Sequence, residues 1–380
     1  MIKVNIVGDF MPIDFIENKI RDNQTDDLLC DELKKIFSDK HVNILNLECP
    51  LTTTSTIHAK TGKNFKSNPN SIAFLKRYNF KIACLANNHI MDYGISGLQD
   101  TMNVCTTNHI HTIGIREKQD TSIYRHVEND LSVSFINAAE QEFGAANRND
   151  MGFLKEYPEN IFYLIQEEKK KSNYVMLILH GGREFYDLPS PERQKRYRLY
   201  IDMGADAIVS HHTHVISGYE WYHGKPIVYS TGNFYFPIQH KDERWHESMI
   251  AHFELTKEGI AFSYTIAKSN IENQRLELAT DAETTRIQEK IQKLNATIGS
   301  DNEIHSAWKD FTKNEKLQYL YLLNLFSKFR YKMTLKKYLK EPVITTTSLL
   351  RTLNILRCDA HREEAITIIQ EALNEQAKTQ

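Results

Sequence analysis

The sequence lacks the cysteine patterns that build disulfide frameworks or zinc clusters. Its 380 residues contain five cysteines, an odd number, and none of them forms a Cys-x-x-Cys pair. Such cysteines are typically reduced, small hydrophobic side chains of the core. We therefore expect no cysteine ligand to a metal ion among Cys30, Cys49, Cys84, Cys105 and Cys358.

A strong net charge of either sign is also missing. The 47 lysine and arginine side chains are balanced by 49 acidic ones, which leaves a net charge of −2. Proteins that bind nucleic acids usually carry a basic surface, so this balance predicts no nucleic-acid partner. The hydrophobic share of 41% and the charged share of 25% are those of an ordinary globular protein.

Long apolar runs are absent as well. No stretch reaches the roughly 20 apolar residues of a membrane-spanning helix. The first residues, 1–7, enter a strand-like pattern without the apolar core of a signal peptide. We expect a cytoplasmic protein with no transmembrane segment. The length suits one large α/β domain with an appendage, and we find no internal repeat or low-complexity tract.

What the sequence does contain is a cluster of histidines. The apolar run 207–209 is followed closely by His211, His212 and His214. Buried imidazoles must satisfy two ring nitrogens each, so core packing explains this cluster poorly. His212 and His214 are two residues apart and can turn onto one metal ion, while His211 points elsewhere. A histidine-rich surface loop is the alternative interpretation.

Other candidate residues follow predicted strands at the point where each strand ends. They are Asp9 after residues 2–8, Glu48 after 42–47, Asn88 and His89 after 80–85, and His180 after 174–179. Open α/β sheets place their ligands at the carboxyl ends of strands, so we expect these side chains to meet. Taken singly, each is also typical of a turn or a helix cap, and Asp92 could cap the helix predicted from Gly97.

The combined set indicates metal chemistry. Carboxylates, an amide and imidazoles are ligands suited to Mn, Fe or Zn, and they are numerous enough here for two ions that share a carboxylate. Two such ions clamp the oxygens of an in-line displacement, which is the design of a phosphoester hydrolase. His89 follows Asn88 directly and would donate a proton to the leaving group.

These motifs together resemble the CapA family of bacterial capsule (poly-γ-glutamate) synthesis proteins. The matching segments are 8–9, 46–48, 86–89 with 92–94, 180–184, 204–206, 211–215 and 230–234. The resemblance covers about residues 2–268, in order. It implies an α/β fold, the layered calcineurin-like metallophosphoesterase sandwich, followed by a C-terminal helical extension that it does not cover.

The resemblance also implies roles for individual residues. It places six residues at metal positions: Asp9, Glu48, Asn88, His180, His212 and His214. His89 takes the position of the proton donor, and Asp92, Glu184 and Asn233 match signature residues expected to contact substrate or to support the ligands. Two departures stand out. Phe10 and Met11 follow Asp9 where ordinary metallophosphoesterases have Asp-x-His, and Glu48 replaces the usual bridging Asp.

The function implied is that of a metal-dependent hydrolase with two divalent ions. It would act on a phosphoester in capsule or cell-envelope polymer metabolism, with a phosphorylated small molecule or an anionic polymer as substrate. One alternative is hydrolysis or transfer at a γ-glutamyl amide. Another is a non-catalytic, metal-binding component of poly-γ-glutamate capsule synthesis.

The remaining segments carry weaker signals. We divide the chain into a CapA-like domain, 1–270, and a helical extension, 280–380, in which no chemistry is visible. Residues 328–340 contain six basic side chains and no acidic one. We interpret them as a solvated helix face, the alternative being a surface for a protein partner or an anionic surface. The loop with Lys60, Lys63 and Lys66 is likewise interpreted as solvated, and substrate binding is the less favoured role.

Overall fold

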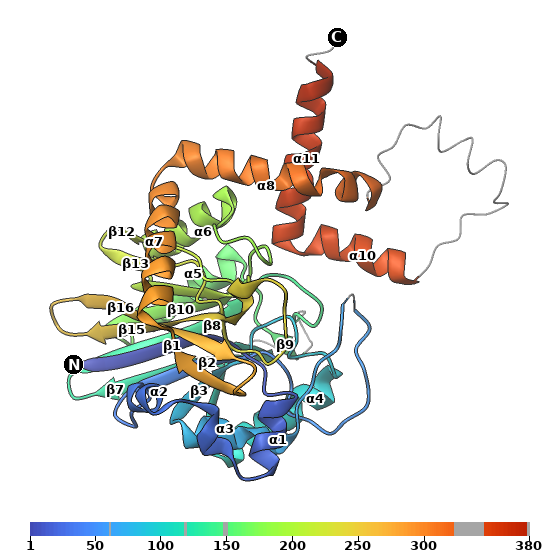
Figure 1. Cartoon of the computed structure of the whole chain (residues 1–380). Helices are drawn as coiled ribbons and strands as arrows, with labels where there is room; N and C mark the ends of the chain where they lie inside the picture. Colours follow the sequence, from blue (N-terminus) through green and yellow to red (C-terminus); the bar gives the residue numbers. More distant parts are fainter. Residues whose placement is uncertain (61, 118–119, 147–150, 323–345, 378–380) are drawn as a thin grey trace.

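Two large β-sheets lie face to face, and helices cover the outer face of each (Figure 1). The computed structural model describes residues 1–60, 62–117, 120–146, 151–322 and 346–377. The prediction of a layered α/β sandwich with C-terminal helices is confirmed. All five cysteines are buried and free, as expected.

The first sheet is parallel at its centre and antiparallel on one side. Strands β1 to β4 pair in parallel in that order, whereas β15 pairs antiparallel with β1. Its strands are β1 (Ile2–Phe10), β2 (Val42–Leu47), β3 (Phe80–Cys84), β4 (His111–Ile113), β14 (Asn233–Tyr235), β15 (Glu247–Leu255), β16 (Ile260–Asn270) and β17 (Arg275–Leu278).

The second sheet is built around four parallel strands, β8, β10, β11 and β13. Its strands are β7 (Tyr124–Glu128), β8 (Leu131–Ala139), β10 (Tyr174–His180), β11 (Ala207–His211), β12 (Tyr219–Tyr222) and β13 (Lys225–Val228). A small third sheet contains β5 (Ile115–Glu117), β6 (Asp120–Thr121) and β9 (Gly152–Phe153).

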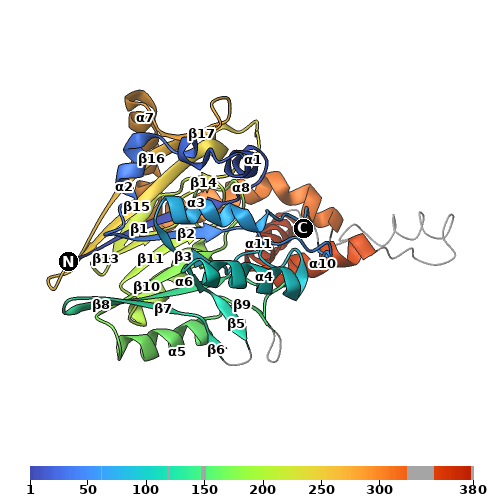
Figure 2. The ribbon, with the colours of Figure 1, turned by 90° about the horizontal axis from the view of Figure 1, so that it is seen from below.

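Helices pack on both outer faces, and Figure 2 shows α3 and α4 over the strands of the first sheet. On that side lie α1 (Phe15–Arg21), α2 (Asp31–Ile36), α3 (Ile72–Arg77) and α4 (Gly94–Thr107), with the 3-10 helices η1 (Thr25–Leu28) and η2 (Pro69–Ser71). On the second sheet lie α5 (Pro158–Lys169) and α6 (Pro191–Asp202). A third 3-10 helix, η3, spans Glu243–His246.

Side-chain alternation explains the layers. In β10, Met176 and Ile178 enter the core between the sheets, while Val175, Leu177 and Leu179 pack under α5 and α6. Successive side chains of a strand point to opposite faces, so a strand covered on both faces must be apolar at every position. This is why the central strands appear in the sequence as uninterrupted apolar runs.

The helix expected over residues 26–38 forms as two short pieces, η1 and α2. Between them Leu29 makes a bridge to Leu276, and the backbone N–H of Cys30 donates to the Leu276 carbonyl at 3.0 Å. Pairing with a distant strand therefore overrides the local helical pattern.

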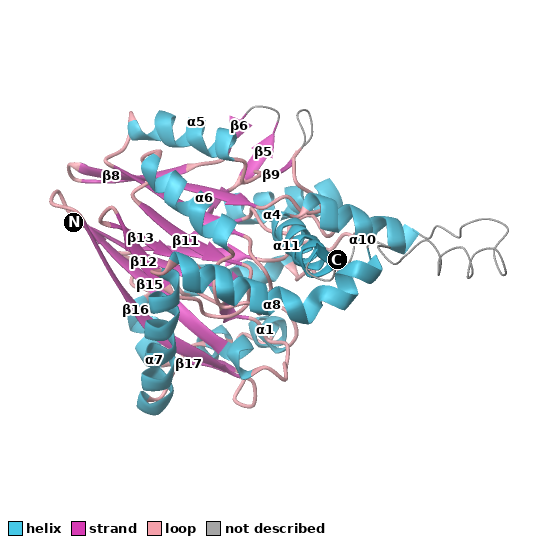
Figure 3. Ribbon diagram, turned by 90° about the horizontal axis from the view of Figure 1, so that it is seen from above, coloured by secondary structure: helices cyan, strands magenta, loops and turns pink. Residues whose placement is uncertain are grey.

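The C-terminal helices are α7 (Asp281–Ile298), α8 (Asp301–Leu322), α10 (Thr346–Arg357) and α11 (Asp359–Ala377). In α7, Ile287 and Ile291 belong to the core between the sheets. Figure 3 shows α8, α10 and α11 gathered at one end of the sandwich. The division at residues 270–280 stays a proposal, and the basic stretch 328–340 lies outside the described residues. Within the described part of the chain, no helix is both long and apolar enough to cross a membrane.

Gly8 offers a test of how β1 and β14 are held together beside the candidate site. A Cβ atom at Gly8 would lie 1.9 Å from the backbone carbonyl oxygen of Gly232. We expect Gly8→Ala to lower the free energy of unfolding by about 1–3 kcal/mol or more, because backbone must move to admit the methyl group. Urea denaturation measures the change.

The matched control is Gly299→Ala at the end of α7. The atom nearest to its Cβ would be the Asn295 carbonyl oxygen at 3.4 Å, and its φ of −72° suits alanine. Equal stability losses in the two variants would contradict the tight contact at Gly8.

Candidate metal centre

The six predicted metal ligands gather where the two sheets present their carboxyl ends. Asp9 is the next-to-last residue of β1, Glu48 follows β2, and His180 is the last residue of β10. His212 and His214 follow β11. Asp9, Glu48 and these histidines are all buried, none more than 6% exposed. These side chains do lie together, and they come from strand ends of both sheets, while their role as metal ligands stays a prediction.

Their ligand atoms converge in two overlapping groups. One group contains Glu48, His180 and His212, and the other contains Asp9, Glu48 and His214, with ligand atoms within 4.8 Å of one another in each. His180 Nε2 lies 3.1 Å from His212 Nδ1, and the Asn88 side-chain oxygen lies 3.0 Å from the same His180 nitrogen. Glu48 is the residue common to both groups.

Glu48 provides the test of whether a cation fits. Both of its carboxylate oxygens are buried, and neither has a hydrogen-bond partner among the described residues. A buried carboxylate without a partner costs several kcal/mol, whereas a cation between the oxygens removes that cost. With imidazoles and a second carboxylate at hand, the donor set suits a divalent transition-metal ion.

Asp9, by contrast, is well supplied with donors. The Asn46 side-chain amide donates to its Oδ1 at 2.8 Å, and the backbone N–H of His212 donates to its Oδ2 at 3.1 Å. His214 Nδ1 approaches Oδ2 at 3.4 Å. Burial acts against the charged carboxylate, but the bond from His214 and the charge of His180 outweigh it and lower the pKa of Asp9.

The backbone of the histidine loop is strained. His212 has a backbone φ of 95° and His214 has one of 60°, values that residues other than glycine rarely adopt. Such conformations persist where the surroundings impose them, typically at functional sites. They bring both imidazoles back towards Asp9 and Glu48.

Hydrogen bonds fix the tautomer of His214. Its Nδ1 lies 2.9 Å from the Asn233 side-chain oxygen, and the Asn233 amide group donates to the Trp245 carbonyl at 3.0 Å. Because that oxygen can only accept, Nδ1 carries the proton. When the ring is neutral, Nε2 is free to bind an ion. This support is the kind of role expected for Asn233.

The predicted proton donor His89 lies beside the cluster and belongs to neither ligand group. Its Nδ1 lies 2.7 Å from Asp92 Oδ2 and 3.0 Å from Lys60 Nζ. Lys60 also pairs with Asp92 and donates to the Asn88 backbone carbonyl at 3.2 Å. Asp92 is buried behind His89 and does not cap α4, whose N-cap residue is Tyr93.

The interpretation of the lysine loop as solvated is therefore wrong for Lys60, whose side chain is 5% exposed. Lys60 and Lys63 line the cavity in front of the ligands, whereas Lys66 binds the Thr54 carbonyl at 2.6 Å. A lysine stem can cover apolar surface while its ammonium group finds an anionic partner, and here that partner is Asp92.

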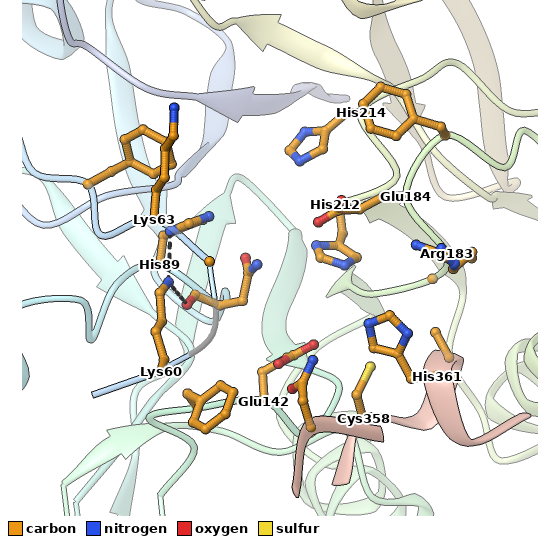
Figure 4. Close-up of a pocket in the computed structure, with 18 of the residues that line it drawn as sticks. Lys60, Lys63, His89, Glu142, Arg183, Glu184, His212, His214, Cys358 and His361 are labelled. Atoms are coloured by element: carbon orange, nitrogen blue, oxygen red, sulfur yellow. Dashed lines mark hydrogen bonds between the residues drawn. The ribbon is translucent and has the colours of Figure 1, made fainter. Parts of the chain in front are cut away.

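The cavity has a volume of about 450 Å³. Its wall includes Glu184, His212 and His214 on one side and His89 on the other, as Figure 4 shows. Burial opposes the charge of Glu184, but the charges of His214 and His212 outweigh it and lower its pKa. Glu184 can therefore present an acceptor to whatever enters.

The sequence shows no chemistry after residue 280, yet this part of the chain contributes to the cavity. Asn354, Cys358, Ala360 and His361, from α10, α11 and the turn between them, line the same cavity. Nothing in their local sequence marks them, because they reach the site through the packing of distant helices.

Two further asparagines, which lie inside the matching segments 46–48 and 86–89 but were not predicted as site residues, orient the ligands by hydrogen bonds. Asn46 donates to Asp9, and Asn87 donates to the Asn46 side-chain oxygen at 3.1 Å. The Asn87 oxygen accepts from the backbone N–H groups of His89 at 3.2 Å and Ile90 at 2.9 Å. A buried amide inside or just after an apolar strand was the available signal.

Comparison with known sequences gives a clear match. Residues 3–238 match the family described as "Bacterial capsule synthesis protein PGA_cap". The chain is 30% identical over 270 residues to "PGA biosynthesis protein CapA" of Bacillus subtilis, covering 68% of this chain and 69% of that protein. It is 28% identical to "Capsule biosynthesis protein CapA" of Bacillus anthracis, covering 54% of this chain but 52% of that protein.

Among solved structures, a putative 5'-nucleotidase from Staphylococcus aureus is a distant match. It is 13% identical, with a TM-score of 0.43, over 77% of this chain and 58% of that one.

Metal binding at this site should depend on pH, because two of its side chains have raised pKa values. Burial opposes a charged His214, but the hydrogen bond to Asp9 and the charge of Glu48 raise its pKa to about 10. Burial and the nearby Asp9 carboxylate raise the pKa of Glu48 well above its usual value. His214 therefore holds a proton at neutral pH that a metal ion must displace, and the raised pKa of Glu48 makes protons compete with the ion there as well.

We expect the affinity for Mn²⁺ to rise between about pH 6 and pH 8, by up to about tenfold per pH unit for each proton displaced. Calorimetry in buffers of different ionisation enthalpy would count the released protons. An affinity independent of pH, with no proton release, would show that these side chains do not take up the ion.

Proposed function

The chain belongs to the bacterial capsule synthesis protein family PGA_cap, which confirms the resemblance to CapA, and from this premise we propose that it is a metal-dependent phosphoester hydrolase. Its substrate would be a phosphorylated intermediate of capsule or cell-envelope polymer metabolism. The family relation supports a role in capsule or cell-envelope metabolism, and the buried cluster of candidate ligands supports metal-dependent chemistry.

A single observation supports the chemistry most strongly. Glu48 is shared by two groups of ligands and has two buried, unpartnered oxygens. Glu48 with His180 and His212 would hold one cation, and Glu48 with Asp9 and His214 would hold a second. The ions would be Mn, Fe or Zn on the chemistry of the donors.

Divalent ions in this place would supply Lewis-acid stabilisation of the negative charge that develops on a phosphoryl group. The protein's own part is to position and to move protons. Glu184 faces the same cavity as His212 and His214 and would orient the substrate. Lys60 and Lys63 add positive charge to the wall that an anionic group must approach.

His89 would serve as the proton donor to the leaving group. Its Nδ1–H donates to Asp92, which leaves Nε2 as the nitrogen available to a ligand. Burial lowers the pKa of His89, although the bond to Asp92 acts in the opposite direction. An anionic phosphoryl group nearby favours the charged imidazolium, so binding of the substrate would favour protonation of His89.

The names of the two Bacillus relatives favour a second candidate. Those proteins are named for the biosynthesis of PGA or of capsule. By analogy, the same cavity would act at a γ-glutamyl amide or hold metal without turnover in a synthesis complex. The positive charges of Lys60 and Lys63 would then meet carboxylates of the polymer.

The deciding experiment uses Mn-loaded protein with two kinds of substrate. We expect turnover of p-nitrophenyl phosphate or its bis-ester, lost on chelation and restored by Mn²⁺. Glu48→Gln should lower both metal content and turnover, because the amide cannot balance two cations. Release of glutamate from γ-glutamyl peptides without phosphoester turnover would select the second candidate. Absence of both activities in a metal-loaded protein would favour the non-catalytic component.

His89→Asn should preserve metal content while lowering phosphoester turnover by about 10²–10⁴-fold, the usual range for loss of a general acid. The loss should be smaller for p-nitrophenyl phosphate than for an alkyl phosphate, since nitrophenolate leaves without protonation. Steady-state kinetics on both esters measure the difference.

The control is His223→Asn, because the His223 side chain is 69% exposed and is absent from the cavity lining. Equal losses for both esters, together with depleted metal, would make His89 a ligand.

A further inference from the structure

One wall of the cavity comes from outside the region that matches the family. Residues 3–238 carry the match, yet Asn354, Cys358 and His361 line the cavity from α10, α11 and the turn between them. In Figure 4 His361 projects from α11 into the space below His212 and beside Arg183. This C-terminal wall, defined as Asn354, Cys358 and His361, meets whatever part of a substrate extends beyond the ligands.

Buried polar contacts hold this wall in place. The backbone N–H of Ala360 donates to Glu140 Oε2 at 3.0 Å. Asp359 pairs with Arg196 at 2.7 Å, and Glu364 pairs with Arg183 at 2.8 Å. Because Glu140 and Glu364 are buried, loss of either charge-assisted contact would leave a buried charge without its partner, which is costly. The wall is therefore a fixed part of the cavity.

The hydrogen-bond network determines what His361 offers. The Tyr319 hydroxyl donates to Glu364 Oε2 at 2.8 Å, so its only proton is engaged. His361 Nδ1 lies 2.6 Å from the same hydroxyl and must donate to it. The Nε2 of a neutral His361 is therefore an acceptor. Burial and the charge of Arg183 keep the ring neutral by lowering its pKa to about 4.

Asn354 adds a second acceptor. Its side-chain oxygen is buried and has no hydrogen-bond partner among the described residues. An unpaired buried oxygen costs about 1–3 kcal/mol, a cost that a donor on a ligand would remove. The nearby guanidinium of Arg183 donates from Nε to Glu364 at 2.8 Å, and its Nη2 lies 3.8 Å from Glu315, so two carboxylates already balance its positive charge.

We propose that the C-terminal wall binds neutral hydrogen-bond donors, and that the substrate is a phosphorylated polyol or sugar whose hydroxyl groups meet His361 and Asn354. This inference rests on the proposed phosphoesterase function of the same cavity. Two acceptors repel a second anionic group, so a carboxylate at that end of the substrate is disfavoured.

The test compares two probes of the same carbon chain length. Sorbitol 6-phosphate ends in a hydroxymethyl group, and 6-phosphogluconate ends in a carboxylate. With Mn-loaded full chain, we expect sorbitol 6-phosphate to compete with p-nitrophenyl phosphate about tenfold more tightly, as for one unmatched buried polar group. Calorimetry in the His89→Asn background, where turnover is expected to be strongly reduced, should give the same ratio.

Variants of the wall should move this ratio in opposite directions. His361→Lys introduces a cation and should abolish or reverse the preference. Asn354→Asp keeps an acceptor, adds negative charge and should widen it. Leu356 lies on α10, as Asn354 does, and is 61% exposed, so Leu356→Ala should leave the ratio unchanged.

The outcomes separate the two proposals. Turnover of p-nitrophenyl phosphate with no preference between the probes, or a preference unaffected by His361→Lys and Asn354→Asp, would overturn the wall assignment alone. A preference for 6-phosphogluconate in the unmodified chain would do the same. No turnover and no binding of either probe would overturn the phosphoesterase function and the wall assignment together.

Discussion

The site depends on the burial of two carboxylates at one sheet edge. Water cannot solvate Asp9 or Glu48, so the protein itself must supply the compensation. Asp9 receives it from Asn46, from the His212 backbone and from a protonated His214. Glu48 receives no hydrogen bond from the described residues, and the nearest imidazole nitrogen, His180 Nε2, lies 3.7 Å from its Oε1. A cation between the two carboxylates would remove this asymmetry.

The distance between the carboxylates and the imidazoles is set by the core between the sheets. Asp9 and Glu48 lie at the ends of strands β1 and β2 of the first sheet, whereas His180 ends β10 and His212 follows β11 of the second. Side chains such as Ile6 and Ile178 fill the space between them. Cores pack as densely as organic crystals, so the sheets cannot slide freely. A ligand set divided between two sheets is thereby held rigidly without a continuous loop joining its members.

The strands and most site residues could be predicted because their signals are local. A buried parallel strand is an apolar run, and a ligand at its carboxyl end interrupts that run visibly, as at His180. Lys60 had no such signal. It reaches His89 across 29 residues of sequence through the path of a loop. His361 was also invisible, because an imidazole in an amphipathic helix indicates nothing until tertiary contacts place the helix. The break at Leu29 has the same cause, a partner strand far away in sequence.

Glu140 joins the two parts of the cavity energetically. Its carboxylate accepts from Gly182 at 2.8 Å and from Arg193 at 3.0 Å, and it lies 3.9 Å from His212 Nε2. It also accepts the Ala360 N–H. Burial opposes its charge, yet Arg193 and His212 lower the pKa of Glu140. The same negative charge thus faces a predicted metal ligand and anchors the start of α11. A cation held by His212 and the docking of α11 would both favour the ionised form of Glu140, so each would favour the other. By this contact the helices beyond the family match would be linked to the centre that the match contains.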